Sequence, residues 1–227
     1  MRRMDRKQLP NGDGHPVVLF PGLGTDPRYM APLKDHCAAL GYVCYDWGRG
    51  FNTGPKGDVR QWLADLASEV STLVSGHQQT ASLIGWSLGG LYAREIAKIL
   101  RTRIRQVITL GSPSSGIADA THAAWLYRLT NGRQGPARQA FARTLKSPPP
   151  VPTSSIYSRT DGVVAWRSCR IASGRRTENI EVESSHLGLV CNPHVLTVVA
   201  DRLAQRAGRW DAWSDTSRRL ATQTASA

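Results

Sequence analysis

Short apolar runs alternate along the first half of the chain with longer stretches whose hydrophobic residues recur at helical spacing. The apolar runs cover residues 16–20, 42–47, 80–84 and 104–110. The helical stretches cover residues 28–40, 60–75 and 88–100. Strands that alternate with helices of this length predict an α/β fold with a mostly parallel central sheet and helices on both faces.

The alternation is interrupted between Gly111 and Pro152. Two helical stretches, 118–129 and 136–146, precede the run from Pro148 to Pro152, whose prolines stop the second helix. Strands at 153–158 and 177–182 and a helix at 193–205 then resume the pattern. We therefore expect the segment at about 111–152 to be a short helical insertion.

These elements divide the chain into three parts. We expect an N-terminal extension over residues 1–14, one domain over 15–208 that contains the insertion, and a C-terminal tail over 209–227. The tail carries Trp210 and Trp213 and is otherwise mostly polar, so we expect it to be partly packed at best. A chain of 227 residues suits one such compact domain.

The sharpest chemical signal is a Gly-x-Ser-x-Gly motif centred on Ser87. It runs from Gly85 to Gly89 and lies between a predicted strand and a predicted helix. A strand, tight turn and helix in this order are typical of a nucleophile elbow, in which the serine hydroxyl is exposed at the carboxyl end of the strand. Ser87 is therefore the predicted nucleophile.

A serine hydroxyl needs a base that accepts its proton and an acid that orients the base, expected in the order serine, acid, histidine. Three histidines follow Ser87, and His186 lies in a loop between the last predicted strand and the last helix. His186 is therefore the predicted base. His122, in the insertion, and His194, at the start of the last helix, remain alternatives.

The predicted acid is Asp161, which follows the strand at 153–158 and precedes His186 by one strand. A carboxylate in that loop can reach the second imidazole nitrogen of the histidine and select its tautomer. Asp119 remains the alternative because it follows the preceding strand after a short loop.

The reaction also requires N–H donors for the oxyanion that develops on the attacked carbonyl group. We expect one donor to be the main-chain N–H of Leu88, immediately after the nucleophile. The second is expected in the turn that follows the first strand, at the N–H of Leu23, which has a glycine on either side.

Together these motifs resemble the α/β-hydrolase superfamily, in particular its bacterial lipases and esterases with a short Pro-Gly-x oxyanion turn. The resemblance spans about residues 15–206. It implies a Ser87, Asp161 and His186 triad, with the insertion as a variable cap over the site. One departure is the oxyanion turn, where lipases often carry His-Gly and this chain carries Pro21-Gly22. No cofactor or metal site is implied.

An apolar cap over an esterase cleft lines the acyl pocket as well as packing on the sheet. The candidate pocket residues are Trp47, Trp86 and Trp125. We therefore expect a small-molecule ester substrate with an apolar acyl group, of medium chain length or aromatic. An acyltransferase or thioesterase with the same triad, and a non-catalytic binding protein on a hydrolase fold, are the alternatives.

Composition adds a large excess of positive charge. The chain has 29 basic and 17 acidic residues, a formal net charge of +12, and its 24 arginines are dispersed from Arg2 to Arg219. Because neither a zinc-finger spacing nor an aromatic RNA-binding motif accompanies the arginines, we expect no nucleic-acid partner. The charge could instead draw anionic substrates or a lipid surface toward the cleft.

The remaining features concern location and thiol chemistry. The chain has no run of about 18 apolar residues, so we expect no transmembrane span. The basic start of the sequence has no apolar stretch behind it, and we therefore expect a cytoplasmic protein. Its four cysteines form no Cys-x-x-Cys pair and are expected to be reduced, with a bridge between Cys169 and Cys191 left open. The oligomeric state is left open as well.

Overall fold

The computed structural model describes residues 9–114 and 147–214 and contains an all-parallel, six-stranded sheet. The strand order is β2-β1-β3-β4-β5-β6. The strands are β1 (Pro16–Phe20), β2 (Val43–Asp46), β3 (Ala81–Trp86), β4 (Ile104–Leu110), β5 (Thr153–Tyr157) and β6 (Thr177–Glu181). The predicted α/β class with a parallel sheet is confirmed.

Burial along the strands follows their positions in the sheet. Every residue of β1, β3 and β5 is buried, whereas the edge strands β2 and β6 are mostly part-exposed. Strands covered on both faces favour apolar side chains at successive positions, which explains why β1 is a continuous apolar run, whereas β5 begins with the small buried polar residues Thr153, Ser154 and Ser155.

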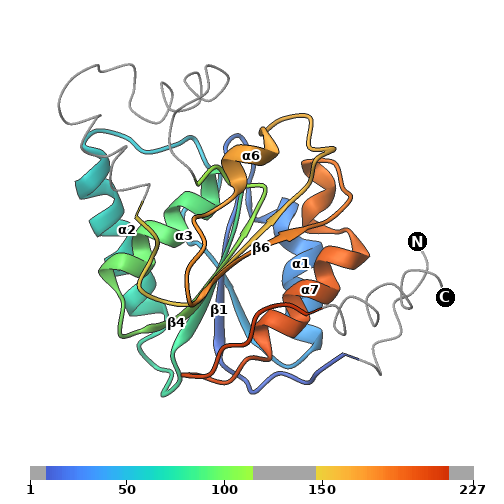
Figure 1. Cartoon of the computed structure of the whole chain (residues 1–227). Helices are drawn as coiled ribbons and strands as arrows, with labels where there is room; N and C mark the ends of the chain where they lie inside the picture. Colours follow the sequence, from blue (N-terminus) through green and yellow to red (C-terminus); the bar gives the residue numbers. More distant parts are fainter. Residues whose placement is uncertain (1–8, 115–146, 215–227) are drawn as a thin grey trace.

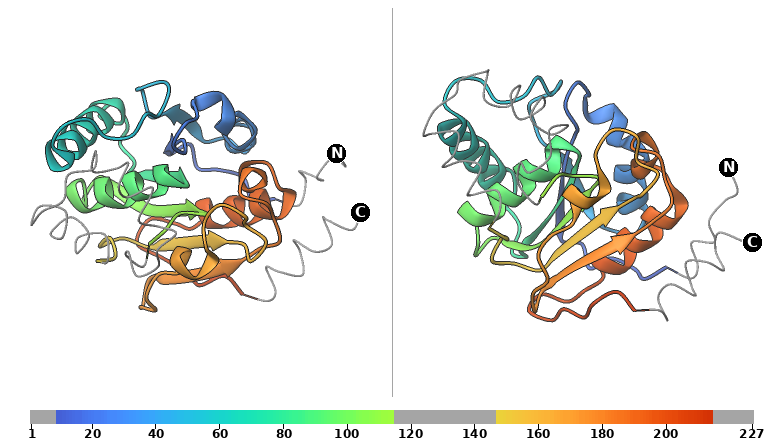
Figure 2. Two further views of the ribbon diagram at one scale, coloured as in Figure 1. Left: turned by 90° about the horizontal axis from the view of Figure 1, so that it is seen from above. Right: turned by 45° about the horizontal axis from the view of Figure 1, so that its top comes forward.

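Helices cover both faces of the sheet, as Figures 1 and 2 show. The longer helices are α1 (Ala31–Ala39), α2 (Val59–Leu73), α3 (Leu88–Ile99) and α7 (Pro193–Leu203), and the shorter ones are η2 (Pro27–Met30), α6 (Trp166–Cys169) and η3 (Leu187–Val190). Helices α2 and α3 lie on one face, and α1 and α7 lie on the other. No helix within residues 9–114 or 147–214 is long and apolar enough to cross a bilayer.

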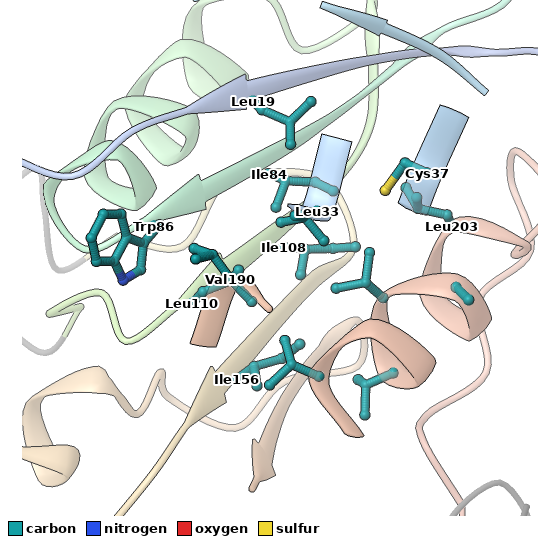
Figure 3. Close-up of a cluster of buried hydrophobic side chains, with 14 of the residues drawn as sticks. Leu19, Leu33, Cys37, Ile84, Trp86, Ile108, Leu110, Ile156, Val190 and Leu203 are labelled. Carbon is teal, nitrogen blue, oxygen red and sulfur yellow. The ribbon is translucent and has the colours of Figure 1, made fainter. Parts of the chain in front are cut away.

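Each face of the sheet has its own hydrophobic core. The core beneath α1 and α7 includes Leu33, Ile84, Ile108, Ile156 and Leu203, all at most 1% exposed (Figure 3). The opposite core joins the apolar faces of α2 and α3 to the sheet. Both faces are therefore filled, and the edge at the carboxyl ends of the strands is left for the site.

The ends of the helices follow local capping rules. Helix α2 begins after Asp58, whose Oδ1 accepts hydrogen bonds from the main-chain N–H groups of Arg60 and Gln61, each at 2.9 Å. Helix α7 begins with Pro193 after Asn192, whose Oδ1 accepts the N–H of His194 at 2.8 Å. Both helices begin within one residue of the starts predicted from hydrophobic spacing, and the two caps explain why they begin there.

Several boundaries differ from the sequence prediction. The stretch predicted as one helix over 28–40 is a 3₁₀ turn, η2, followed by α1. The single-turn helix α6 was not predicted, because four residues are too few to show a hydrophobic period. Trp213, in the expected tail, packs against the core under α7. The predicted cap helices, with Asp119, His122 and Trp125, lie outside the described residues.

The strand order places a topological switch point between β1 and β3. The chain passes from β1 outward to β2 and returns across β1 to β3, from which β4, β5 and β6 follow on the other side. In open parallel sheets the loops at such a point separate and leave a crevice at the carboxyl ends of the strands. The turn after β1 and the motif around Ser87 meet at this point.

Candidate active site

Ser87 occupies a strained turn between β3 and α3. Its backbone angles are φ 54° and ψ −122°, and it is the single non-glycine residue with positive φ among those described. It is also the one residue between Ala81 and Ala97 that is not buried. A side chain held in this unfavourable conformation, at the end of a central strand and at the start of a helix, has the geometry of a nucleophile elbow.

Two glycines of the motif are required by close backbone approach. A Cβ atom on Gly85 would lie 2.3 Å from the carbonyl oxygen of Gly89, and one on Gly89 would lie 2.2 Å from the carbonyl oxygen of Phe20. No side chain fits at either position unless the backbone moves. The glycines therefore allow α3 to start directly over the ends of β1 and β3.

Asp161 and His186 form a buried pair at the same edge of the sheet. Nδ1 of His186 lies 2.7 Å from Oδ2 of Asp161, and the two side chains are 6% and 1% exposed. The other carboxylate oxygen, Oδ1, accepts the main-chain N–H groups of Val163 and Val164, each at 2.9 Å. The carboxylate is thus held by donors on both oxygens, and the imidazole has its Nδ1 occupied.

The loops that carry this pair are tied together by residues for which the sequence shows no motif. The hydroxyl oxygen of Ser158, at the end of β5, accepts the N–H groups of Thr160 and Ser184, each at 3.1 Å. The Thr160 hydroxyl donates to the carbonyl of Ser184 at 3.1 Å. These bonds fix the spacing between the acid loop and the histidine loop.

The elbow and the Asp161–His186 pair are joined through Trp86. Its indole Nε1–H donates to the main-chain carbonyl of His186 at 3.1 Å, and the two rings lie 5.4 Å apart between centroids. Gly111, with φ +54°, lies on the other side of the pair. A Cβ atom on Gly111 would lie 3.0 Å from Asp161 Oδ2 and 3.1 Å from His186 Nδ1. The structure therefore brings Ser87, Asp161 and His186 to one edge of the sheet.

The turn after β1 packs directly on the elbow. A Cβ atom on Gly22 would lie 3.3 Å from the Cβ atom of Ser87. Neither Leu23, in this turn, nor Leu88, at the first position of α3, has a main-chain N–H that donates to an acceptor within the described residues. Leu88 directly follows the serine and Leu23 directly follows Gly22, so both N–H groups without an acceptor among the described residues belong to segments that adjoin the serine.

Asn52 holds this turn in place and was not predicted from sequence. It is fully buried, and its Nδ2 donates to the carbonyl of Pro21 at 2.8 Å. Its main chain exchanges hydrogen bonds with Gly24 and Thr25, each at 2.8 Å. The hydroxyl of Tyr92, on α3, donates to Asn52 Oδ1 at 3.2 Å. The only sequence feature at this position was an asparagine in a glycine-rich loop. Such an asparagine more often indicates a turn than a residue that supports an active site.

The candidate pocket tryptophans are largely buried. Trp47 is 4% exposed and packs against the rings of Trp62 and Tyr92, so most of its surface belongs to the core beneath α2 and α3. Trp86 is 2% exposed and stacks on Tyr29, whose ring is 52% exposed. Trp125 lies outside the described residues.

A second Ser-His-Asp arrangement lies at the opposite end of the strands. His15 bonds to Asp13 through Nδ1 and to the Ser82 hydroxyl through Nε2, the latter at 2.7 Å. His15 and Ser82 are fully buried. Burial, together with the charge of Arg105, lowers the pKa of His15 to about 4 despite the neighbouring carboxylate. A substrate cannot reach this hydroxyl, so the arrangement is a structural network.

The four cysteines differ in burial, and Cys169 is buried close to Asp161. All four are free thiols, including Cys169 and Cys191, for which a bridge was left open. Burial, with a further contribution from the charge of Asp161, raises the pKa of the Cys169 thiol to about 12. Because the thiolate is the reactive form, Cys169 is inert at neutral pH.

Comparison with known proteins identifies the family to which this chain is similar. The sequence model of the alpha/beta hydrolase family matches residues 17–225. A pimeloyl-[acyl-carrier protein] methyl ester esterase of Legionella pneumophila (strain Corby) is 28% identical over 108 residues, which are 48% of this chain and 42% of that protein. The match thus spans less than half the length of this relative.

Solved structures share the fold at low sequence identity. The mature lipase BlEst2 of Bacillus licheniformis superposes with a TM-score of 0.63 at 14% identity, covering 86% of this chain and 94% of the lipase. A lipase-esterase related protein of Clostridium acetobutylicum superposes with a TM-score of 0.57 at 17% identity, covering 85% and 95%. At these identities the likeness shows the fold alone.

Proposed function

Because the chain belongs to the alpha/beta hydrolase family, we propose that it hydrolyses carboxylic esters through an acyl-serine intermediate, with Ser87, His186 and Asp161 as the catalytic triad. The observation that carries the proposal is the strained conformation of Ser87 at the edge where the buried Asp161–His186 pair lies. The ester class is supported by the methyl ester esterase named among the relatives.

In the first half of the proposed reaction, Nε2 of His186 accepts the proton of the Ser87 hydroxyl while Oγ attacks the carbonyl carbon of the ester. Asp161 keeps the proton on Nδ1, which leaves Nε2 as the acceptor, and stabilises the imidazolium that forms. The main-chain N–H groups of Leu23 and Leu88 bind the oxyanion. When the tetrahedral intermediate collapses, the imidazolium gives its proton to the leaving alkoxide and the acyl-serine remains.

In the second half, water attacks the acyl-serine carbonyl and His186 accepts a proton from that water. A second tetrahedral intermediate forms in the same oxyanion site. Its collapse breaks the bond to Ser87 Oγ, which takes the proton back from His186, and releases the carboxylic acid. No cofactor or metal is required for either half.

The substrate proposed is a small-molecule ester with an apolar acyl group. Tyr29 and Trp86 form a stacked aromatic pair beside the elbow, and the insertion with Trp125 would complete the pocket. The test compares hydrolysis of acetyl and octanoyl p-nitrophenyl esters by the native protein and by Trp125→Ala. Equal rates on both esters, unchanged by the substitution, would contradict a selective role for the cap.

The catalytic assignment is tested by labelling with a fluorophosphonate, which traps an activated serine. The native protein should be labelled, and Ser87→Ala and His186→Ala should not. Ser82→Ala is the matched control, because Ser82 also bonds to a histidine but is fully buried, and it should keep its label. Labelling that persists in folded Ser87→Ala would refute the proposal.

A transferase or thioesterase would form the same intermediate. Product analysis in the presence of added alcohols separates acyl transfer from hydrolysis. Dominant transfer of the acyl group to the alcohol identifies a transferase, whereas free acid as the main product supports a hydrolase, and a higher kcat/KM for the oxygen ester than for the matching thioester then supports the esterase.

A further inference from the structure

A large cavity lies at the end of the sheet opposite the candidate active site. Its volume is about 810 Å³, and its lining includes the segments that begin β3, β4, β5 and β6, together with the segment that follows α7. Ser87 and the loops of Asp161 and His186 follow the carboxyl ends of these strands. The length of β3, about 17 Å at the usual rise of a strand, separates the cavity from the elbow.

The lining of this cavity is strongly basic, and we call it the arginine cavity. Six arginines line it, namely Arg101, Arg105, Arg175, Arg176, Arg206 and Arg209. None of the lining residues that the structure describes is an aspartate or a glutamate. The arginines come from three separate segments of the chain, at 101–105, 175–176 and 206–209, so the fold brings together charges that are dispersed in the sequence.

Most of this charge has no acidic partner in the part of the chain that the structure describes. Arg105 pairs with Asp13 at 2.8 Å, but the other five arginines form no ion pair within residues 9–114 and 147–214. Arg176 donates to the carbonyl of Pro150 at 3.3 Å, which orients its guanidinium without balancing its charge. Gathering like charges in a hollow is unfavourable unless a counter-ion occupies it.

Two buried N–H groups on residues of the lining also have no acceptor within the described chain. One is Nε of Arg105, whose side chain is only 5% exposed. The other is Nε1 of Trp210. Buried donors almost always have a hydrogen-bond partner in folded proteins. Both atoms have less than 1 Å² of accessible surface, so they lie behind the wall and cannot contact a ligand in the cavity; the exposed guanidinium groups of the lining are the donors that can.

The chemistry of the lining selects the ligand. Guanidinium groups bind phosphate oxygens in a bidentate manner, and several of them suit adjacent phosphates. The rest of the wall is apolar and includes Ile104, Val151, Pro152 and Trp210. A volume of about 810 Å³ lies in the range of small-molecule sites. We propose that the arginine cavity binds a small organic polyphosphate, of the size of a nucleoside diphosphate or triphosphate.

This site is independent of the proposed esterase. A substrate carrier that delivers an acyl group must reach Ser87, which the arginine cavity does not adjoin. The cavity is also a local hollow, whereas binding of duplex nucleic acid uses a basic surface that follows many successive phosphates. The observations thus favour a compact ligand over a polymer.

Binding can be measured by titration calorimetry with inorganic tripolyphosphate and with ATP, in about 150 mM NaCl to screen unspecific attraction. The informative variant is Arg175→Gln/Arg206→Gln, since both side chains are exposed and can be replaced without disturbing the core. The matched control is Arg60→Gln/Arg170→Gln, which removes the same charge from two exposed arginines outside the cavity.

We expect both probes to bind the native protein at one site, and the dissociation constant to rise at least about tenfold in the cavity variant and less than about twofold in the control. Tighter binding of ATP than of tripolyphosphate would show that the organic part also contacts the wall, and equal affinities would assign the site to the phosphates alone. The proposal would be overturned if the affinity fell equally in both variants, or if neither probe bound below about millimolar concentration. Tighter binding of duplex DNA than of either probe would also overturn it.

Discussion

The indole N–H of Trp86 donates to the main-chain carbonyl of His186 at 3.1 Å. Trp86 is the residue before Ser87, so this bond joins the backbone of the candidate nucleophile to the backbone of the candidate base. The alignment of the two side chains therefore depends on a residue that takes no part in proton transfer.

Trp86→Phe keeps most of the ring and removes the donor. We expect kcat for an ester substrate to fall about tenfold to a hundredfold, because small displacements of a base from its nucleophile have effects of this size. Steady-state kinetics with p-nitrophenyl butyrate measures the change. Trp62→Phe, on α2, makes the same substitution away from the pair and should stay close to native activity; an equal loss in both variants would contradict a positioning role.

Asp161→Asn replaces the carboxylate by an amide of the same shape. We expect kcat to fall about ten thousandfold, because the amide no longer stabilises the required imidazole tautomer or the imidazolium. The matched control is Asp13→Asn, which makes the same change beside His15 and should lower thermal stability while sparing turnover. Near-native turnover in Asp161→Asn would remove Asp161 from the proposed triad.

Gly111→Ala tests the space around the pair. The position has φ +54°, and the new methyl group would lie 2.6 Å from Leu189 Cδ1 as well as near both members of the pair. We expect kcat/KM to fall at least about a hundredfold, with a loss of about 1–3 kcal/mol in unfolding free energy from backbone strain. Gly162→Ala, where nothing lies within 4 Å of the added atom, should show neither effect in kinetics or thermal melts.

Asn52→Ala removes the side chain that holds the turn carrying Leu23. We expect kcat to fall about tenfold or more while KM changes less, because a displaced N–H donor affects the transition state more than the bound ester. The rate of fluorophosphonate labelling should fall in parallel. A variant that loses stability but keeps the native kcat would show that Asn52 supports the fold alone.

The buried His15 predicts how stability depends on pH. Its pKa is lowered from 6.5 to about 4 in the folded protein, so the unfolded chain binds more protons between these values. The unfolding free energy should therefore be highest above pH 6.5 and fall as the pH is lowered toward 4. Between pH 6.5 and 4 the unfolding free energy should decrease by on the order of 3 kcal/mol.

Denaturant titrations of the native protein and of His15→Gln at several pH values isolate this contribution. The variant should be less stable at neutral pH and should lose less stability between pH 6.5 and 4. Burial by itself would raise the pKa of Asp13, but hydrogen bonds from Arg105 and His15 outweigh it and lower that pKa. Protonation of Asp13 should therefore lower the unfolding free energy further at more acid pH. Parallel pH profiles for the two proteins would contradict the assignment to His15.

Local chemistry explains which features were predictable from sequence. Continuous apolar runs mark strands buried on both faces, and Asp58 and Asn192 mark helix starts, so the α/β class and most element boundaries follow from residues close together in the chain. The elbow is equally local, because Gly85, Ser87 and Gly89 must stand at fixed spacing for α3 to begin over β1.

Tertiary structure decided the features that depend on distant segments. A sequence separation of 25 does not determine a distance of 2.7 Å between Asp161 and His186; the pairing of β5 with β6 and the bonds of Ser158 do. Asn52 belongs to no sequence motif, because its partners are supplied by the turn after β1 and by α3. The arginine cavity could not be predicted from the sequence either, because the arginines are dispersed along the chain. Six of them line one cavity only once the strands align in parallel. The sequence determines how far apart the charged residues lie along the chain. Only the packing of the strands and helices determines which of them lie next to the same cavity.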